Sequence, residues 1–109
     1  MLSVYNLYFL EYVLEQLSDL EDVTYYPMMG EYVIYYQGKV IGGIYDYRFL
    51  VKNTVSARAY MERNDFTLPL EIPYQGAKPM IAVDIDDRRT TCELIEEIWK
   101  DLPERKRKK

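Results

Sequence analysis

EYVIYYQGKVIGGI, residues 31–44, is the stretch of sequence on which the fold depends. Two runs rich in β-branched and aromatic residues, Glu31–Tyr36 and Lys39–Ile44, flank the short turn Gln37-Gly38. Runs of this composition favour strands, and glycine accepts the positive φ that a tight turn needs. The stretch therefore predicts a β-hairpin near the middle of the chain.

Further strands are predicted on both sides of this hairpin. Val23–Met29 precedes it, but Pro27 cannot donate to a strand ladder, so this run is expected at an edge of the sheet or broken there. Tyr47–Val51 follows the hairpin. Two later runs, Leu70–Tyr74 and Met80–Ile85, are separated by a glycine-containing turn and predict a second pair of strands.

Helical periodicity marks three other segments. Residues 3–18 carry leucines at three- and four-residue spacing, which predicts a helix with one buried face: Leu7, Leu10, Leu14 and Leu17. Ser3 is the expected N-cap of this helix. A second helix is expected from a cap at Asn53 or Thr54 to about residue 63, with Ala57, Tyr60 and Met61 inside. The third runs from about residue 89 to 102, and its buried face comprises Leu94, Ile95, Ile98, Trp99 and Leu102.

The predicted order is helix, three or four strands, helix, two strands, helix. Such an order favours a two-layer α+β fold (α-β-β-β-α-β-β-α), with an antiparallel sheet of about five strands covered on one face by three helices. The 109 residues suit one domain. We expect residues 1–103 to form it and residues 104–109 to be a disordered basic tail.

The charge is unevenly distributed along the chain. The tail holds five of the 14 basic residues: Arg105, Lys106, Arg107, Lys108 and Lys109. Residues 1–103 hold the other nine and 17 acidic residues, a net charge of −8. An acidic body repels nucleic acid, so weak binding to nucleic acid is expected only through the tail. The alternative is that the tail is simply solvated.

Location and chemistry are constrained by what the chain contains. Residues 1–17 lack a basic start, and Glu11 and Glu15 interrupt their apolar residues, so we expect no signal peptide, no membrane span and a cytoplasmic location. The chain has no histidine, and Cys92 is its only cysteine. We therefore expect no catalytic residue, no metal and no cofactor, and interpret Cys92 as a buried small apolar residue.

Two other features could carry chemistry but have simpler interpretations. Asp84 and Asp86 resemble the Asp-x-Asp start of phosphotransfer enzymes, although Asp86 or Asp87 capping the last helix is the favoured interpretation. Gly42-Gly43 would let a small ligand approach the backbone, whereas a bulge or close packing under a helix explains it more simply.

Tyrosine is the unusual component of this sequence, with 12 of them in 109 residues. Several fall on neighbouring strands, and alternation of side chains means that some must lie on the face away from the core. We predict a surface that binds a protein or a second copy of the chain, formed by Tyr25, Tyr26, Met28, Met29, Tyr35 and Tyr36. The alternative is that tyrosine pairs only stabilise the sheet.

Five motifs in order resemble the N-terminal domain of TfoX/Sxy-type proteins. They are EYVLEQL at residues 11–17, VT and MMG within 23–30, YYQG at 35–38, FLVK at 49–52 and IPYQGAKP at 72–79. The resemblance extends over about residues 8–102, and Glu31 stands where the family has the second glycine of a pair. It implies an α+β fold related to secretion chaperones. It also implies a non-enzymatic role in regulating competence or transcription through a protein partner. The family's longer members carry a C-terminal domain, and we expect this chain to be a stand-alone copy without it.

Overall fold

The computed structural model describes residues 4–103, with side chains from Asn6 onward. It contains three helices and one antiparallel sheet of six strands, so the α+β class is confirmed, with four strands rather than three before the middle helix. In chain order the elements are α1 (Val4–Gln16), β1 (Val23–Met28), β2 (Glu31–Tyr36), β3 (Lys39–Tyr45), β4 (Arg48–Val51), α2 (Val55–Arg63), β5 (Leu70–Glu71), β6 (Met80–Ala82) and α3 (Arg88–Asp101).

The sheet has the order β1-β2-β3-β4-β6-β5, so the predicted hairpin is its β2–β3 pair. β1 lies at one edge, as Pro27 requires, and the two-residue β5 lies at the other. The register between β2 and β3 shifts between Ile34 and Tyr35, which leaves Ile41 as an extra residue on β3. This bulge moves Ile41 into the core, where it is fully buried.

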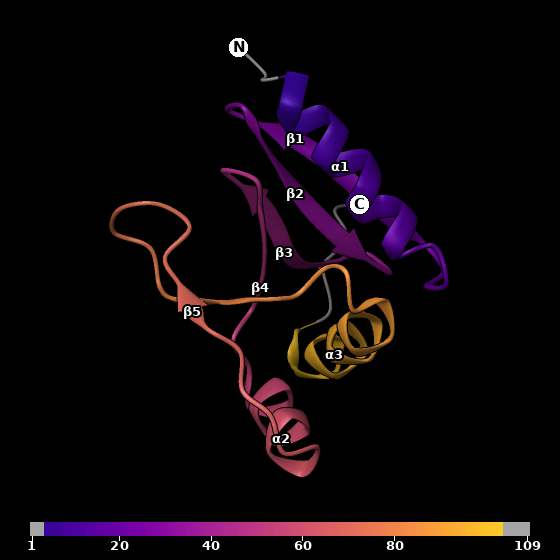
Figure 1. The fold of residues 1–109 in the computed structure, drawn as a ribbon, viewed down its shortest axis with the longest axis vertical. Coiled ribbons are helices and arrows are strands. Elements are labelled where there is room, and N and C mark those ends of the chain that lie inside the picture. The colour runs from indigo at the N-terminus through magenta and orange to yellow at the C-terminus, as the bar shows by residue number, and fades with distance from the viewer. Residues whose placement is uncertain (1–3, 104–109) are drawn as a thin grey trace, which may run out of the picture.

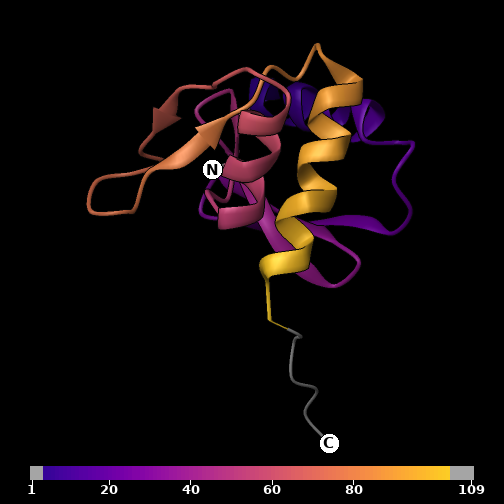
Figure 2. The ribbon, with the colours of Figure 1, turned by 90° about the horizontal axis from the view of Figure 1, so that it is seen from below.

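The helices pack on one face of the sheet, which we call the helix face. In Figure 1, α1 lies over β1 and β2, α3 lies near the C-terminal end of α1, and α2 lies beside α3 at the far end of the molecule. Figure 2 shows α2 and α3 side by side, with the connection between β5 and β6 projecting away from them. Alternate residues of β2 enter the core on this face: Tyr32, Ile34 and Tyr36.

The buried stripe of α1 differs from the predicted one at its first position. Leu10, Val13 and Leu17 are buried, but the Leu7 side chain is 43% exposed. Each helical residue turns by about 100°, which places Leu7 roughly a quarter turn from the centre of the stripe. Asn6 takes the inner position instead, and its Nδ2 donates to the carbonyl of Gly30 at 3.0 Å. Ser3, the predicted cap, lies outside the described residues.

Both later helices begin at capping residues that the sequence indicated. The Thr54 hydroxyl accepts from the backbone N–H of Ala57 at 3.2 Å, and an Asp87 carboxylate oxygen accepts from that of Thr90 at 3.2 Å. The predicted inner side of α2 is confirmed, since Ala57, Tyr60 and Met61 are its buried residues. Each cap satisfies a helix N–H that would otherwise lack an intrahelical partner.

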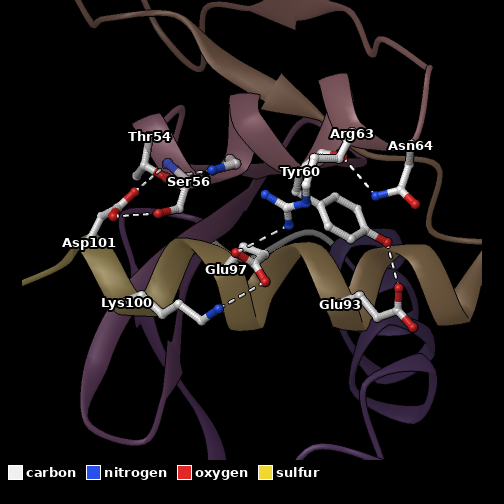
Figure 3. A network of polar contacts seen from close by, with 10 residues as sticks. Thr54, Ser56, Tyr60, Arg63, Asn64, Glu93, Glu97, Lys100 and Asp101 are labelled. Atoms are coloured by element: carbon white, nitrogen blue, oxygen red, sulfur yellow. Dashed lines mark hydrogen bonds and ion pairs between the residues drawn. The ribbon is translucent and has the colours of Figure 1, made fainter.

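Polar contacts join α2 to α3 along their length (Figure 3). At one end, the backbone N–H and the hydroxyl of Ser56 both donate to the Asp101 carboxylate at 2.7 Å. Further along, the Tyr60 hydroxyl donates to Glu93 at 2.6 Å. Burial, and then the hydrogen bond to Glu93, raise the pKa of Tyr60 to about 12. These contacts fix α2 on α3, and α3 fixes both on the sheet.

Candidate functional site: the open face of the sheet

The face of the sheet opposite the helices is called here the open face. Tyr26 pairs with Val33 and Met28 with Glu31, so these residues share one face of the β1–β2 pair. Since Tyr32, Ile34 and Tyr36 point into the core, strand alternation puts their neighbours on the opposite face. Its members on the first three strands are Thr24, Tyr26, Met28, Glu31, Val33, Tyr35, Val40 and Tyr45.

The six residues predicted as an interaction surface are divided between the two faces. Tyr26, Met28 and Tyr35 lie on the open face, and Met29 lies in the β1–β2 turn and is 96% exposed. Tyr25 lies on the helix face, where its ring meets that of Tyr32 edge-on at 5.8 Å between centroids.

Tyr36 does not belong to the predicted surface. It is 8% exposed and packs edge-on against Trp99, with 6.4 Å between ring centroids. Consecutive tyrosines on a strand point to opposite faces, so Tyr35 and Tyr36 could not both reach the same surface. The predicted nucleic-acid tail, residues 105–109, lies outside the described part of the chain.

A hollow of about 400 Å³ opens on the open face beside β3. Its apolar lining comes from β3, β6 and the β5–β6 connection: Val40, Gly42, Tyr45, Pro73, Tyr74, Ala77, Pro79 and Met80. Its polar lining is Lys52, Asn53, Thr54 and Lys78. Two stretches that carry the family resemblance, residues 49–52 and 72–79, therefore meet here.

Arg48 fastens the wall of this hollow. Its Nε donates to the Tyr45 carbonyl at 3.0 Å, and its terminal nitrogens donate to the Glu71 carboxylate at 2.9 Å and to the carbonyls of Ile72 and Pro73 at 3.3 Å. The rigid fork of a guanidinium suits such a multiple contact. Pro73, whose carbonyl accepts one of these bonds, is buried although it belongs to a connecting segment.

Tyrosine packing and the glycine pair shape the floor of the hollow. The rings of Tyr45 and Tyr74 lie 6.2 Å apart, and burial raises the pKa of Tyr45. A Cβ on Gly43 would lie 2.7 Å from the Tyr45 hydroxyl, and one on Gly42 would lie 2.2 Å from the Leu50 carbonyl oxygen. The glycine pair is therefore required by close packing against neighbouring strands and the Tyr45 ring, and not, as was predicted, by packing under a helix.

The two lysines of the hollow are electrostatically unusual. Five of the nine basic residues between positions 4 and 103 form ion pairs with carboxylates: Arg48, Arg63, Arg88, Arg89 and Lys100. Lys39 lies 3.7 Å from the centre of the Trp99 ring, and Arg58 donates to Asn53. Within the described residues, only Lys52 and Lys78 have no such partner, and both line the hollow. No acidic residue lines it.

The residues considered for catalysis have structural roles. The Cys92 thiol is buried and donates to the carbonyl of Gln16 at 3.6 Å, and burial raises its pKa, which opposes formation of the reactive thiolate. An Asp84 carboxylate oxygen accepts from the backbone N–H of Asp86, whose own carboxylate accepts from the Tyr12 hydroxyl. β6 ends at Ala82, so alternation does not align the two carboxylates.

Over residues 4–103, acidic, cysteine and histidine side chains form no group of three or more that could hold a metal ion. None of the three helices is long and apolar enough to cross a membrane within that same range. No protein-family model matches the chain, and no curated protein sequence matches it.

Five residues of the hollow and its wall were not predicted from the sequence: Arg48, Lys52, Tyr45, Tyr74 and Lys78. Lys52 and Tyr74 fall in motifs that were noted for their resemblance, but nothing in the motifs indicated that the two segments meet. Contacts between positions 48 and 71–73 depend on the order of strands β4, β6 and β5, which no local pattern specifies.

Proposed function

We propose that this chain is a non-enzymatic regulatory or adaptor domain that works by protein contact, and that the open face over β1, β2 and β3 is its contact surface. The observation that carries the proposal is the exposure of large apolar side chains there: Tyr26 is 58% and Met28 51% exposed. No helix covers this part of the face within residues 4–103 (Figure 1). Aromatic residues and methionine are enriched at protein interfaces.

The partner that best fits this face is a basic protein surface. Residues 1–103 carry a net charge of −8, which attracts cations over long distances and makes two copies of the chain repel each other. Tyrosine rings accept the guanidinium and ammonium groups of a partner through cation–π contacts. Glu31 adds a carboxylate on the same face, and burial raises its pKa, with the charge of Asp46 acting in the same direction.

The regulatory part of the proposal is supported by the resemblance to TfoX/Sxy N-terminal domains. The quoted motifs fall on α1, β1 with the turn that follows it, the β2–β3 turn, β4 and the β5–β6 connection, which lie in one continuous fold. Such a resemblance favours a partner that regulates competence or transcription. It gives the proposed class of function, whereas the open face gives the place of contact.

Site-specific photocrosslinking in the native host tests the proposal. A benzophenone amino acid replaces Tyr26 on the open face in one variant and Tyr8 on α1 in the control, since both side chains are more than half exposed. We expect the probe at position 26 to capture a basic protein and the probe at position 8 to capture none. The capture at position 26 should be lost when Met28→Asp is added.

Three outcomes would contradict the proposal. Equal capture from both positions would show that the open face is not special, and capture that survives Met28→Asp would show that the contact does not involve it. A crosslink only to a second copy of the chain would replace the basic partner with a homodimer.

A further inference from the structure

We propose that the hollow beside β3 is a binding site for a small organic anion with an aromatic or aliphatic body. The proposal does not rest on the protein contact described above: Tyr26 and Met28, which carry that contact, do not line the hollow, although Val40 and Tyr45 belong to both surfaces. The anionic head would lie between Lys52 and Lys78, and the apolar body would contact Tyr45, Tyr74 and the two prolines.

The size and lining of the hollow suit a small ligand. Small-molecule sites in proteins commonly enclose roughly 300–1,000 Å³ and have a mostly apolar and aromatic lining with a few polar groups. This hollow measures about 400 Å³ and has eight apolar or aromatic residues, glycine included, and four polar ones in its lining. A ligand the size of a substituted benzene ring therefore fits it.

The charge of the ligand follows from the lysines. Acidic residues outnumber basic ones by 17 to nine in residues 1–103, so unpaired carboxylates are abundant on this chain. Even so, Lys52 and Lys78 have no acidic partner among the described residues, and they lie in a hollow without a carboxylate. Two ammonium groups next to apolar surface attract an anion and disfavour a cation. A lysine ammonium binds carboxylate or phosphate as a point charge, so either head group satisfies this chemistry.

The wall of the hollow is held in place before any ligand arrives. Arg48 makes three hydrogen bonds to residues 71–73 and a fourth to the Tyr45 carbonyl, and Pro73 is buried. Binding to a preformed site avoids the entropic cost of ordering a loop. The hollow is therefore a fixed feature of the fold.

NMR titration of the isotopically labelled full-length chain provides the test. The probes share one ring: phenylacetate and phenyl phosphate are anionic, and phenylacetamide is neutral. We expect at least one anion to shift the backbone amides of Gly42, Thr54 and Ala77 with millimolar affinity, and phenylacetamide to bind more weakly. Comparing the two anions identifies the preferred head group. Raising the salt concentration should weaken binding of the anion, because screening reduces its attraction to the two lysines.

A pair of double variants distinguishes binding at this site from a general attraction of the anion to positive charge on the chain. K52Q/K78Q should weaken binding of the anion about tenfold, since two partly exposed charge interactions are lost. R89Q/K100Q removes the same charge from two residues of α3 that do not line the hollow, and should leave the affinity unchanged. Because Lys52 and Lys78 have no ion-pair partner between positions 4 and 103, their replacement should also leave the urea midpoint unchanged.

The proposal is overturned if neither anion shifts the amides around the hollow. It is also overturned if phenylacetamide binds as tightly as phenylacetate, or if K52Q/K78Q keeps the wild-type affinity for the anion.

Discussion

Arg48 links two parts of the chain more than 20 residues apart through one guanidinium group. It joins the β3–β4 turn to the segment that walls the hollow, and its contacts include three backbone carbonyls and the Glu71 carboxylate. Carbonyls that lose such a donor while partly buried have no equivalent partner. This residue therefore controls the shape of the hollow without lining it.

Arg48→Lys should loosen the β5–β6 connection while leaving the rest of the fold intact. A lysine ammonium keeps the charge but cannot reach four acceptors in a plane, so we expect a loss of about 1–3 kcal/mol in the free energy of unfolding. Urea denaturation measures this loss, and amide exchange should accelerate at residues 74–79. Arg63→Lys is the control, because Arg63 has one long ion pair, at 3.9 Å to Glu97. Equal effects from the two variants would contradict the role of Arg48.

Asp101 should make the α2–α3 contact sensitive to acid. The hydroxyl and the backbone N–H of Ser56 donate to its carboxylate, which lowers its pKa below the ordinary value of 3.8. A carboxyl with a lower pKa in the folded state stabilises the fold above its unfolded pKa, and this contribution is lost as pH falls through the folded pKa. The stability difference between wild type and Asp101→Asn should therefore be largest near neutral pH and vanish in acid.

Urea denaturation of both proteins at a series of pH values from neutral into acid measures this difference. Glu96→Gln, on the exposed side of α3, controls for the loss of one negative charge. A wild-type advantage over Asp101→Asn that persists unchanged into acid would show that the carboxylate charge is not involved.

Single residues were predictable from the sequence where their role is local. Thr54 and Asp87 were among the expected caps, and Ala57, Tyr60 and Met61 were expected inside α2, because these roles depend on residues three or four positions away. Roles that depend on distant segments were not. Tyr36 was placed on the surface, and the burial of Asn6 against Gly30 was not expected.

At the scale of elements, strands β3 and β4 approach so closely that one glycine becomes indispensable. A Cβ at Gly42 would lie 2.2 Å from the carbonyl oxygen and 3.1 Å from the carbonyl carbon of Leu50. Both are backbone atoms in the middle of the sheet, and they cannot move without breaking the β3–β4 ladder. The position tolerates no side chain.

Gly42→Ala should therefore lower the free energy of unfolding by about 3 kcal/mol. Gly76→Ala is the matched control: its Cβ meets no atom within 4 Å, so only the positive φ of +90° opposes it, at about 1 kcal/mol. Thermal or urea denaturation compares the two variants. If Gly76→Ala is the more damaging, the close approach of β3 to β4 does not determine stability here.

Most elements were identified from composition and periodicity, and the errors concern their ends. The hairpin turn and the three helices follow from local signals and lie where they were expected. By contrast, β5 and β6 were predicted to reach Tyr74 and Ile85, but they contain two and three residues. The carbonyls of Ile72 and Pro73 accept hydrogen bonds from Arg48 and not from a neighbouring strand, and residues 83–87 form the turn that caps α3. Tertiary contacts, rather than strand propensity, end both strands.

Local stability is expected to vary across the molecule, from well-buried central strands to an exposed edge strand. β2, β3 and β4 lie in the interior of the strand order and supply many of the fully buried residues. β1 bonds to one neighbour only, and every residue after Val23 in it is exposed. Strands with few buried side chains open at lower free energy than the global fold. The proposed contact surface therefore includes an edge strand with little burial.

Hydrogen exchange should resolve this gradient. For the isolated chain at low concentration, we expect the amides of β1 to exchange well before those of β3, whose residues Ile41–Ile44 are all buried. Exchange in β1 should not change as the protein concentration rises, because two acidic bodies repel each other. If amide exchange slows only in β1 at high protein concentration, a second copy covers the open face, and the surface is a dimer interface. Slowing that appears only when a basic partner is added would place that partner on β1.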